Sequence, residues 1–381
     1  MKTEYWRVDG PDDSQIQAAG RILRGGGLVA FPTETVYGLG ANGFDAEAVA
    51  GVYRAKGRPA DNPLILHVSS VDEAKALTDD WCPAAELLAR ELWPGPLTLI
   101  LAAKSSIPAI VTAGLDTVAV RYPSEPIALA LIRAAGVPIA APSANTSGKP
   151  SPTSGDHVLA DLGGRIDVIL DGGPCAIGIE STIVDLTVTP PVILRPGDIT
   201  CERLSDILSE VRLYATSTVD PGSAPDTDAQ AAPAPKAPGM KYRHYAPWAP
   251  VTVLEGEPEA IAQYIKGHIF GKGRAGGVDA ACSDSTKVGL LLSEDTWAVL
   301  ADKGISVRDA DFRRHFYRDM GSRSKPEVMG RRLYDSLRAC DREAVSHIYA
   351  EACTDEGRGA AVLNRLGKAA SATIKCQDRE S

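Results

Sequence analysis

The sequence predicts an α/β protein of two domains, and three observations lead to this prediction. At 381 residues the chain is longer than one typical core supports, so two domains are expected. Short apolar runs typical of buried strands alternate with segments of helical period through most of its length. Between residues 216 and 239 the composition shifts to Pro, Ala, Ser, Thr and Asp, which indicates a linker. We therefore expect a first domain over residues 1–214, a linker over 215–248 and a second domain over 249–381.

Charge, hydropathy and cysteine usage limit the classes of protein to be considered. The net charge of −9 argues against a broad electrostatic grip on nucleic acid. No apolar segment is long enough to span a bilayer, and the N-terminus lacks an apolar signal core, so we expect a cytoplasmic protein without membrane contact. The seven cysteines are scattered and contain no C-x-x-C pair, which is typical of reduced thiols and predicts no protein-bound metal.

The first domain is expected to alternate strands with helices. Ser14 is a suitable N-cap for a helix through Leu23, which the glycines at 25–27 end. Apolar runs predict strands at residues 28–31, 64–68, 97–101, 118–121, 137–141, 166–170, 182–186 and 192–194. Helical periods predict helices before Lys56 and at 71–77, 83–93, 127–135 and 202–211. Polar residues gather where the apolar runs stop, so we expect one site built from several loops.

The turn at residues 31–40 (FPTETVYGLG) directly follows the first apolar run. Ligands of open α/β sheets bind at the carboxyl ends of strands, so this position is informative. Thr33 and Thr35 supply hydroxyls, Tyr37 supplies a ring, and two glycines permit close backbone approach. The alternative is a tight connection in which the threonine pair has no function. A second turn rich in hydroxyls, at residues 142–151, follows the strand at 137–141.

Residues 56–67 (KGRPADNPLILH) form a stiff loop that leads into a short buried strand. Lys56 is expected on the last turn of a helix, and Gly57 just beyond it. The ammonium of Lys56, the guanidinium of Arg58 and the amide of Asn62 suit a polyanion such as a triphosphate. The alternative is a solvated surface loop, which the neighbouring polar turns make less attractive.

The second domain repeats the alternation of strands and helices. Strands are expected at residues 251–254, 288–292 and 347–350, and helices at 258–265, 296–301, 327–339 and 360–370. A G-x-G-x-x-G match at 271–276 follows a helix rather than a strand, so we interpret it as a cationic loop and not a dinucleotide site. The segment 238–247 (PGMKYRHYAP) carries two tyrosines, a histidine and two cations, which favours a docking segment. The alternative for it is a strand at the domain edge.

Seven motifs together resemble a known family. They are FPTETVYGLG (31–40), KGRPADNPLILH (56–67), TVAVRYP (117–123), APSANTSGKPSPT (141–153), GIESTIVDL (178–186), ILRPG (193–197) and PGMKYRHYAP (238–247). In this order they resemble the threonylcarbamoyl-AMP synthases, in the long form with an N-terminal YrdC-like domain. The resemblance implies an α/β fold with a twisted mixed sheet and helices in the first domain. It implies a smaller, Rossmann-like, three-layer α/β second domain.

The resemblance also implies a reaction. ATP, L-threonine and bicarbonate or carbon dioxide would condense to threonylcarbamoyl-AMP and pyrophosphate, the first step of tRNA threonylcarbamoyladenosine modification. A separate threonylcarbamoyl transferase complex would take the product, and direct tRNA binding by this chain is left open. Mg²⁺ would arrive with the phosphates of ATP rather than on a protein cage.

Site residues follow from the same resemblance, position by position. The family's signature tetrad corresponds to Lys56, Arg58, Ser143 and Asn145. Threonine should contact Thr35, His67, Arg121, the Ala141 backbone and Ser181. ATP should contact Arg58, Asn62, Thr117, Ser143, Ser151, Arg195, Pro238 and Tyr242. The segment 238–247 should fold over the nucleotide as a lid, with His244 and Tyr245 near the bicarbonate.

Two other functions remain as alternatives. One is carbamoyl transfer, as in hydrogenase maturation proteins that carry a related domain, but the cysteine clusters of those proteins are absent here. The other is an RNA-binding module, because YrdC-like domains have a basic concave face. The acidic net charge argues against RNA binding as the main role.

Overall fold

The computed structural model describes residues 2–214, 236, 244–269, 287–305 and 314–377. It divides into two compact units, Met1–Tyr242 and Arg243–Ser381. Most of the expected linker lies outside the described residues, as does the glycine-rich loop at 271–276. Residues 236 and 244–248 are the described part of the linker, and Lys236 Nζ donates to Asp185 Oδ2 and Thr187 Oγ1, each at 3.1 Å. This contact fastens one point of the linker to the first unit.

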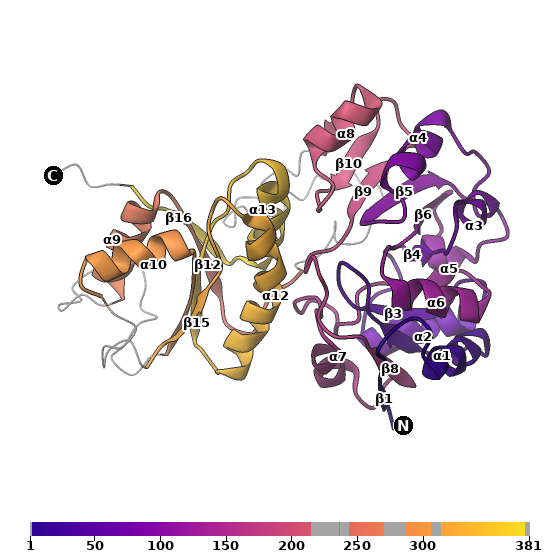
Figure 1. Ribbon diagram of the computed structural model, residues 1–381, viewed down its shortest axis with the longest axis horizontal. Helices are drawn as coiled ribbons and strands as arrows, with labels where there is room; N and C mark the ends of the chain where they lie inside the picture. Colours follow the sequence, from indigo (N-terminus) through magenta and orange to yellow (C-terminus); the bar gives the residue numbers. More distant parts are fainter. Residues whose placement is uncertain (1, 215–235, 237–243, 270–286, 306–313, 378–381) are drawn as a thin grey trace, which may run out of the picture. The chain divides into compact units, whose positions relative to one another are not determined.

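The described strands of the first unit form one mixed sheet of eleven strands, in the order β1-β8-β2-β3-β7-β4-β6-β5-β9-β10-β11 (Figure 1). The sheet contains both parallel pairs, such as β4 and β6, and antiparallel pairs, such as β5 and β6. The strands are β1 (Glu4–Arg7), β2 (Val29–Phe31), β3 (Gly38–Asn42), β4 (Ile65–His67), β5 (Leu97–Ala102), β6 (Thr117–Arg121), β7 (Ile139–Ala140), β8 (Val168–Asp171), β9 (Thr182–Asp185), β10 (Val192–Arg195) and β11 (Arg212–Leu213). This mixed sheet confirms the predicted fold class.

Successive residues of a strand point to opposite faces of the sheet, and here both faces carry apolar side chains. Helices cover each face and bury these side chains. Val29 and Phe31 pack in the core formed by α1 (Ser14–Arg24) and α6 (Pro126–Ala135). Ala30, between them, belongs to the opposite core, which includes the apolar residues of α2 (Ala46–Lys56). The remaining helices of this unit are α3 (Val71–Ala76), α4 (Pro83–Leu92), α5 (Ala109–Thr112), α7 (Gly155–Leu162) and α8 (Cys201–Leu208).

Two local predictions for the first unit are wrong. The N-cap of α1 is Asp13, whose carboxylate accepts from Gln15 N at 2.9 Å, so Ser14 is the first helical residue instead of the cap. The second half of the turn at 31–40 is the strand β3, which pairs antiparallel with β2 and β7. Its two glycines leave room for Phe31 and Ile139, because a Cβ at Gly40 would lie 2.7 Å from Ile139 Cγ2.

Helix α2 positions the residue that opens the 56–67 loop. Asp45 caps its start by accepting from Glu47 N and Ala48 N. The helix ends at Lys56, and Gly57 follows in the left-handed conformation with φ +61°. Glycine adopts this backbone without the steric strain that a Cβ brings. The predicted placement of Lys56 on the last turn is confirmed.

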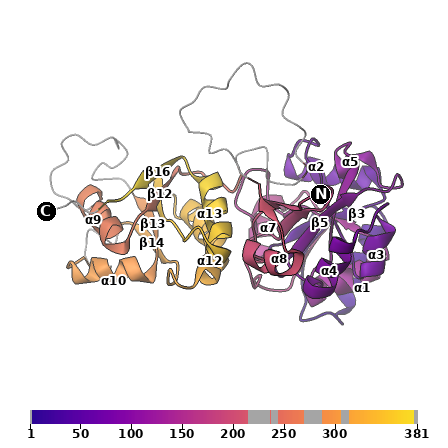
Figure 2. The same cartoon turned by 90° about the horizontal axis from the view of Figure 1, so that it is seen from above.

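The second unit is a three-layer α/β domain. Its described strands form a five-stranded, all-parallel sheet in the order β14-β13-β15-β12-β16. These strands are β12 (Val251–Glu255), β13 (Val288–Leu292), β14 (Phe316–Asp319), β15 (His347–Glu351) and β16 (Ala372–Lys375). Helices α9 (Pro258–His268) and α10 (Glu294–Asp302) cover one face, and α12 (Pro326–Arg342) and α13 (Gly357–Ala369) cover the other (Figures 1 and 2). Among the described helices, none combines the length and apolar character that a membrane crossing requires.

Candidate functional site

Lys56 joins the helix α2 to the hydroxyl-rich turn that follows β7. Its buried Nζ donates to Ser143 O at 2.5 Å and to Asn145 O at 2.6 Å, with Asn145 Oδ1 at 3.4 Å. Ser143 Oγ in turn donates to Asn145 Oδ1 at 2.6 Å. Three members of the predicted tetrad, Lys56, Ser143 and Asn145, therefore lie together. The ammonium group of Lys56 lies against the backbone carbonyls of this turn.

Arg58 and Asn62 shape the loop that follows α2. The Arg58 Nη2 group donates to Asn62 O at 3.1 Å, and its guanidinium lies over the Tyr53 ring at 5.8 Å. The Tyr53 hydroxyl donates to the same carbonyl at 3.1 Å. Asn62 is 1% exposed, so its amide is held inside the protein rather than in solvent. Side-chain contacts and burial thus hold this loop in place, which argues against the alternative of a solvated surface loop.

Arg121, at the end of β6, is the centre of a second polar group. The register of β4 and β6 places it beside His67, and its Nη1 donates to Thr35 Oγ1 at 2.9 Å. Its Nη2 lies 2.8 Å from Glu34 Oε1. All four side chains are buried, and they come from three predicted motifs. A guanidinium in such surroundings is a strong site for a carboxylate.

His67 is neutral at physiological pH in this environment. Burial lowers its pKa from 6.5 to about 3, and the positive charge of Arg121 acts in the same direction. Its Nδ1 lies 3.2 Å from Ile65 O. A neutral imidazole donates from one nitrogen and accepts at the other, so His67 can bind a polar ligand without adding charge.

Ser181 and Ser151 take part in a third group of polar contacts in the first unit. Ser181 Oγ lies 2.8 Å from Thr98 Oγ1 and accepts from Arg195 Nη2 at 3.1 Å. Arg195 Nε also donates to Ser181 O at 3.0 Å. Ser151 Oγ donates to Glu180 Oε1 at 2.5 Å. Arg195 therefore contacts a residue predicted for threonine, although the resemblance assigns Arg195 itself to ATP.

The remaining predicted residues are placed less directly. Thr117 is buried at the start of β6, opposite Ala102. Ala141 is buried, and its N–H is used by Ile65 O at 2.9 Å, which leaves its carbonyl to face other groups. Pro238 and Tyr242 lie outside the described residues. His244 and Tyr245 belong to the second unit, where the buried Tyr245 ring lies 5.3 Å from the Tyr334 ring of α12.

Three residues at these contacts were not predicted as site residues: Glu34, Thr98 and Glu180. Glu34 and Glu180 stand inside quoted motifs, beside Thr35 and Ser181. No local pattern distinguishes Glu34 from a solvated residue of a turn. Thr98 lies inside an apolar strand, and only the pairing of β5 with β9 brings it to Ser181.

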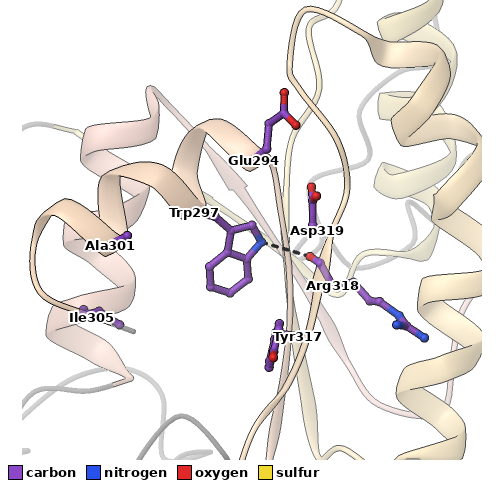
Figure 3. A pocket seen from close by; sticks show the side chains of 7 residues that line it. All are labelled: Glu294, Trp297, Ala301, Ile305, Tyr317, Arg318 and Asp319. Carbon is purple, nitrogen blue, oxygen red and sulfur yellow. Dashed lines mark hydrogen bonds between the residues drawn. The ribbon is translucent and has the colours of Figure 1, made fainter. Parts of the chain in front are cut away.

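The second unit contains a cavity of about 470 Å³ between α10 and β14 (Figure 3). It is lined by Glu294, Trp297, Ala301, Ile305, Tyr317, Arg318 and Asp319. The Trp297 indole lies across its middle and donates from Nε1 to Arg318 O at 3.3 Å, with the Tyr317 ring 5.8 Å away (Figure 3). None of the predicted site residues lines this cavity.

Comparison with known proteins identifies the family. Residues 21–197 match the family described as telomere recombination, and residues 199–371 match the threonylcarbamoyl-AMP synthase C-terminal domain. The Bacillus subtilis threonylcarbamoyl-AMP synthase is 44% identical over 380 residues, covering 98% of this chain and 99% of that protein. The structure of Pyrococcus abyssi Sua5 complexed with L-threonine superposes with a TM-score of 0.82 at 42% identity, covering 99% of this chain and 100% of the other. The chain therefore belongs to the threonylcarbamoyl-AMP synthase family.

Proposed function

We propose that this protein condenses L-threonine with bicarbonate or carbon dioxide and ATP, and that it releases threonylcarbamoyl-AMP and pyrophosphate. The observation that carries this proposal is the buried Arg121 guanidinium, held by Thr35 beside a neutral His67. Support comes from the relative of known structure, which is complexed with L-threonine. The same unit contains the cluster of Lys56, Ser143 and Asn145.

Threonine would bind with its carboxylate at Arg121. Buried charge-assisted hydrogen bonds of this kind are stronger than neutral ones, and they fix the ligand's orientation. The hydroxyls of Thr35 and Ser181, the His67 ring and the Ala141 carbonyl would then contact the rest of the amino acid. These groups would place the amino nitrogen of threonine for attack on carbon dioxide, once the ammonium has lost a proton and become a neutral amine.

ATP would bind along the loops after α2 and β7. Arg58 would pair with phosphate oxygens, and Asn62, Thr117, Ser143, Ser151 and Arg195 would supply neutral and charged donors. Mg²⁺ would accompany the nucleotide. Among the described residues, no three His, Cys, Asp or Glu side chains gather to hold a metal, so phosphate oxygens and water would supply most of its ligands.

The chemical step would form a bond between a carbamate oxygen and the α-phosphorus while the bond to pyrophosphate breaks. Both reactants are anions, so neutralisation of charge and positioning dominate the work of the protein. The segment 238–247 stays a predicted lid over the nucleotide, with His244 and Tyr245 near the bicarbonate. A lid would protect the carbamate and the acyl adenylate from water.

The product would pass to a threonylcarbamoyl transferase complex that modifies tRNA, and the reaction would take place in the cytoplasm. Acyl adenylates are hydrolysed in water, so a prompt transfer step is required by the chemistry.

Pyrophosphate release tests the proposal. Purified protein with ATP and Mg²⁺ should release pyrophosphate only when both L-threonine and bicarbonate are present. Release that requires carbamoyl phosphate instead of bicarbonate would favour the carbamoyl transfer reaction. RNA binding without any pyrophosphate release would favour the binding module.

A further inference from the structure

Glu34 is a buried carboxylate with one oxygen, Oε1, paired with Arg121, and a second oxygen, Oε2, that accepts no hydrogen bond among the described residues. Its side chain is 9% exposed, and its partner Arg121 is 5% exposed. Oε1 lies 2.8 Å from Arg121 Nη2. Buried carboxylates normally accept several hydrogen bonds, and leaving them without donors is costly. The position of Glu34 therefore indicates a donor that the chain itself does not supply.

In the guanidinium of Arg121, Nη1 donates to Thr35 and Nη2 pairs with Glu34, so Nε is the nitrogen without an acceptor among the described residues. Nε and Nη2 form one edge of the guanidinium, the fork that binds a carboxylate through two parallel bonds. A ligand that has both an acceptor and a donor would supply the partners that Arg121 Nε and Glu34 Oε2 lack.

We propose that Glu34 binds the ammonium group of the amino acid substrate while Arg121 binds its carboxylate. This inference rests on the proposed function, since it concerns the same amino acid. An ammonium group has three donors and would give Glu34 the hydrogen bonds that it lacks. Glu34 then determines specificity, because the pair recognises a zwitterion rather than any carboxylic acid.

Charge balance supports this assignment. Glu34 and Arg121 are oppositely charged, and a zwitterion brings one charge of each sign, so each buried group meets its opposite. A hydroxy acid would place a second carboxylate at the same guanidinium with no cation beside Glu34. Repulsion between the two carboxylates would weaken its binding.

A merely structural role makes a different prediction. If Glu34 only orients Arg121, its replacement should weaken every carboxylate ligand to the same extent. If Glu34 binds the ammonium, its replacement should weaken threonine alone. The ratio of two affinities therefore separates the two roles.

Calorimetric titration without ATP measures that ratio. The two ligands are L-threonine and its analogue in which a hydroxyl replaces the amino group. Wild-type protein should bind threonine about tenfold or more tightly than the analogue. In Glu34→Gln this preference should fall about tenfold or more, through loss of threonine affinity. Glu125→Gln, which removes a nearby carboxylate that does not contact Arg121, should keep the wild-type preference.

Three outcomes would overturn the inference. The first is a Glu34→Gln protein that keeps its affinity for both ligands, and the second is an equal loss of affinity for both. The third is equal affinity of the wild-type protein for both ligands, a result that needs no variant to fold. Thermal unfolding checks that Glu34→Gln is folded. A folded wild-type protein that binds no threonine would overturn the proposed function itself, whereas the first three outcomes leave it intact.

Discussion

At the residue scale, several charged side chains of the candidate site are buried and shielded from solvent. Lys56 and Arg121 are 2% and 4% exposed, so their interactions are screened less than those of surface cations. His67 gives up its charge in the same surroundings. In the proposed function, each of these side chains would therefore affect both the position of a ligand and the electrostatic potential around it.

Arg58 tests the assignment of the phosphate site. In Arg58→Ala a charge-assisted contact to phosphate is lost, which is worth about 1.5–3 kcal/mol, so turnover should fall at least about tenfold. Steady-state pyrophosphate release measures the effect, and circular dichroism checks the fold. Arg54→Ala, which removes an exposed arginine from the helix α2 that precedes the Arg58 loop, is the matched control and should stay near wild type. A folded and fully active Arg58→Ala protein would contradict the assignment.

His67 makes the stability of the first unit depend on pH. Its folded pKa of about 3 lies below the ordinary 6.5, so the unfolded chain binds more protons between these values. The stability that neutral His67 provides is present above pH 6.5 and declines as the pH falls towards 3. Between pH 7 and pH 5, wild-type protein should lose about 2 kcal/mol more than His67→Gln. Urea unfolding at both values measures this, with the exposed His268→Gln as control; equal losses in all three proteins would refute it.

The motifs predicted which residues belong to the candidate site better than they predicted which of these residues contact one another. Lys56, Ser143 and Asn145 could be predicted together because their motifs resemble those of the family, in which these positions form a signature set. Glu34 could not, since a glutamate between two threonines is usually solvated. Its pairing depends on the strand order that brings Arg121 next to the turn at 31–40, and no local pattern encodes that order.

At the element scale, the end of α2 determines where Lys56 lies. Gly57→Ala should destabilise the protein by about 1–2 kcal/mol, because φ +61° strains a residue with a Cβ. The added Cβ would meet nothing within 4 Å, so the effect is conformational. Gly51→Ala, inside helix α2, should stabilise the protein by roughly 0.5–1 kcal/mol, because alanine favours a helix more than glycine does. The new Cβ would lie 3.5 Å from Leu28, which is an ordinary contact. Denaturant unfolding of both variants checks the opposite signs, and equal signs would contradict the argument.

Elements with a buried apolar run were predictable, and elements without one were not. Strand β13 lies at the predicted residues 288–292 because each of its residues is buried. Strand β1 (Glu4–Arg7) carries charges at both ends and lies at the sheet edge, so its sequence does not show a strand pattern. Strand β3 is glycine-rich because bulky neighbours pack against it.

At the scale of the whole molecule, each unit has its own hydrophobic core. The composition break predicted this division, because a segment without large apolar residues cannot join a core. The order of the strands could not be predicted, since pairs such as β5 and β9 join segments far apart in the chain. Two cores also mean that the first unit can be tested alone.

A chain that ends at Tyr214 tests the role of the segment 238–247. The truncated protein retains the whole eleven-stranded sheet, so it should fold and bind threonine. Without the lid, adenylate synthesis should fall by most of its value, because water would reach the carbamate. Full-length protein with His244 and Tyr245 both changed to alanine should show the same loss. Wild-type synthesis by the truncated protein would show that the segment is only a tether.

The position of β8 between β1 and β2 has a consequence for the protein during translation. Thr3 Oγ1 donates to Ile166 O, 163 residues later, and among the described strands β1 pairs with β8 alone. At ribosomal speeds the intervening chain takes roughly 10–30 s to make. During that interval β1 has no partner strand, and apolar β2 lacks one of its neighbours. The nascent first unit therefore exposes unpaired strand edges that chaperones bind, and it cannot complete its site before Arg195 has left the ribosome.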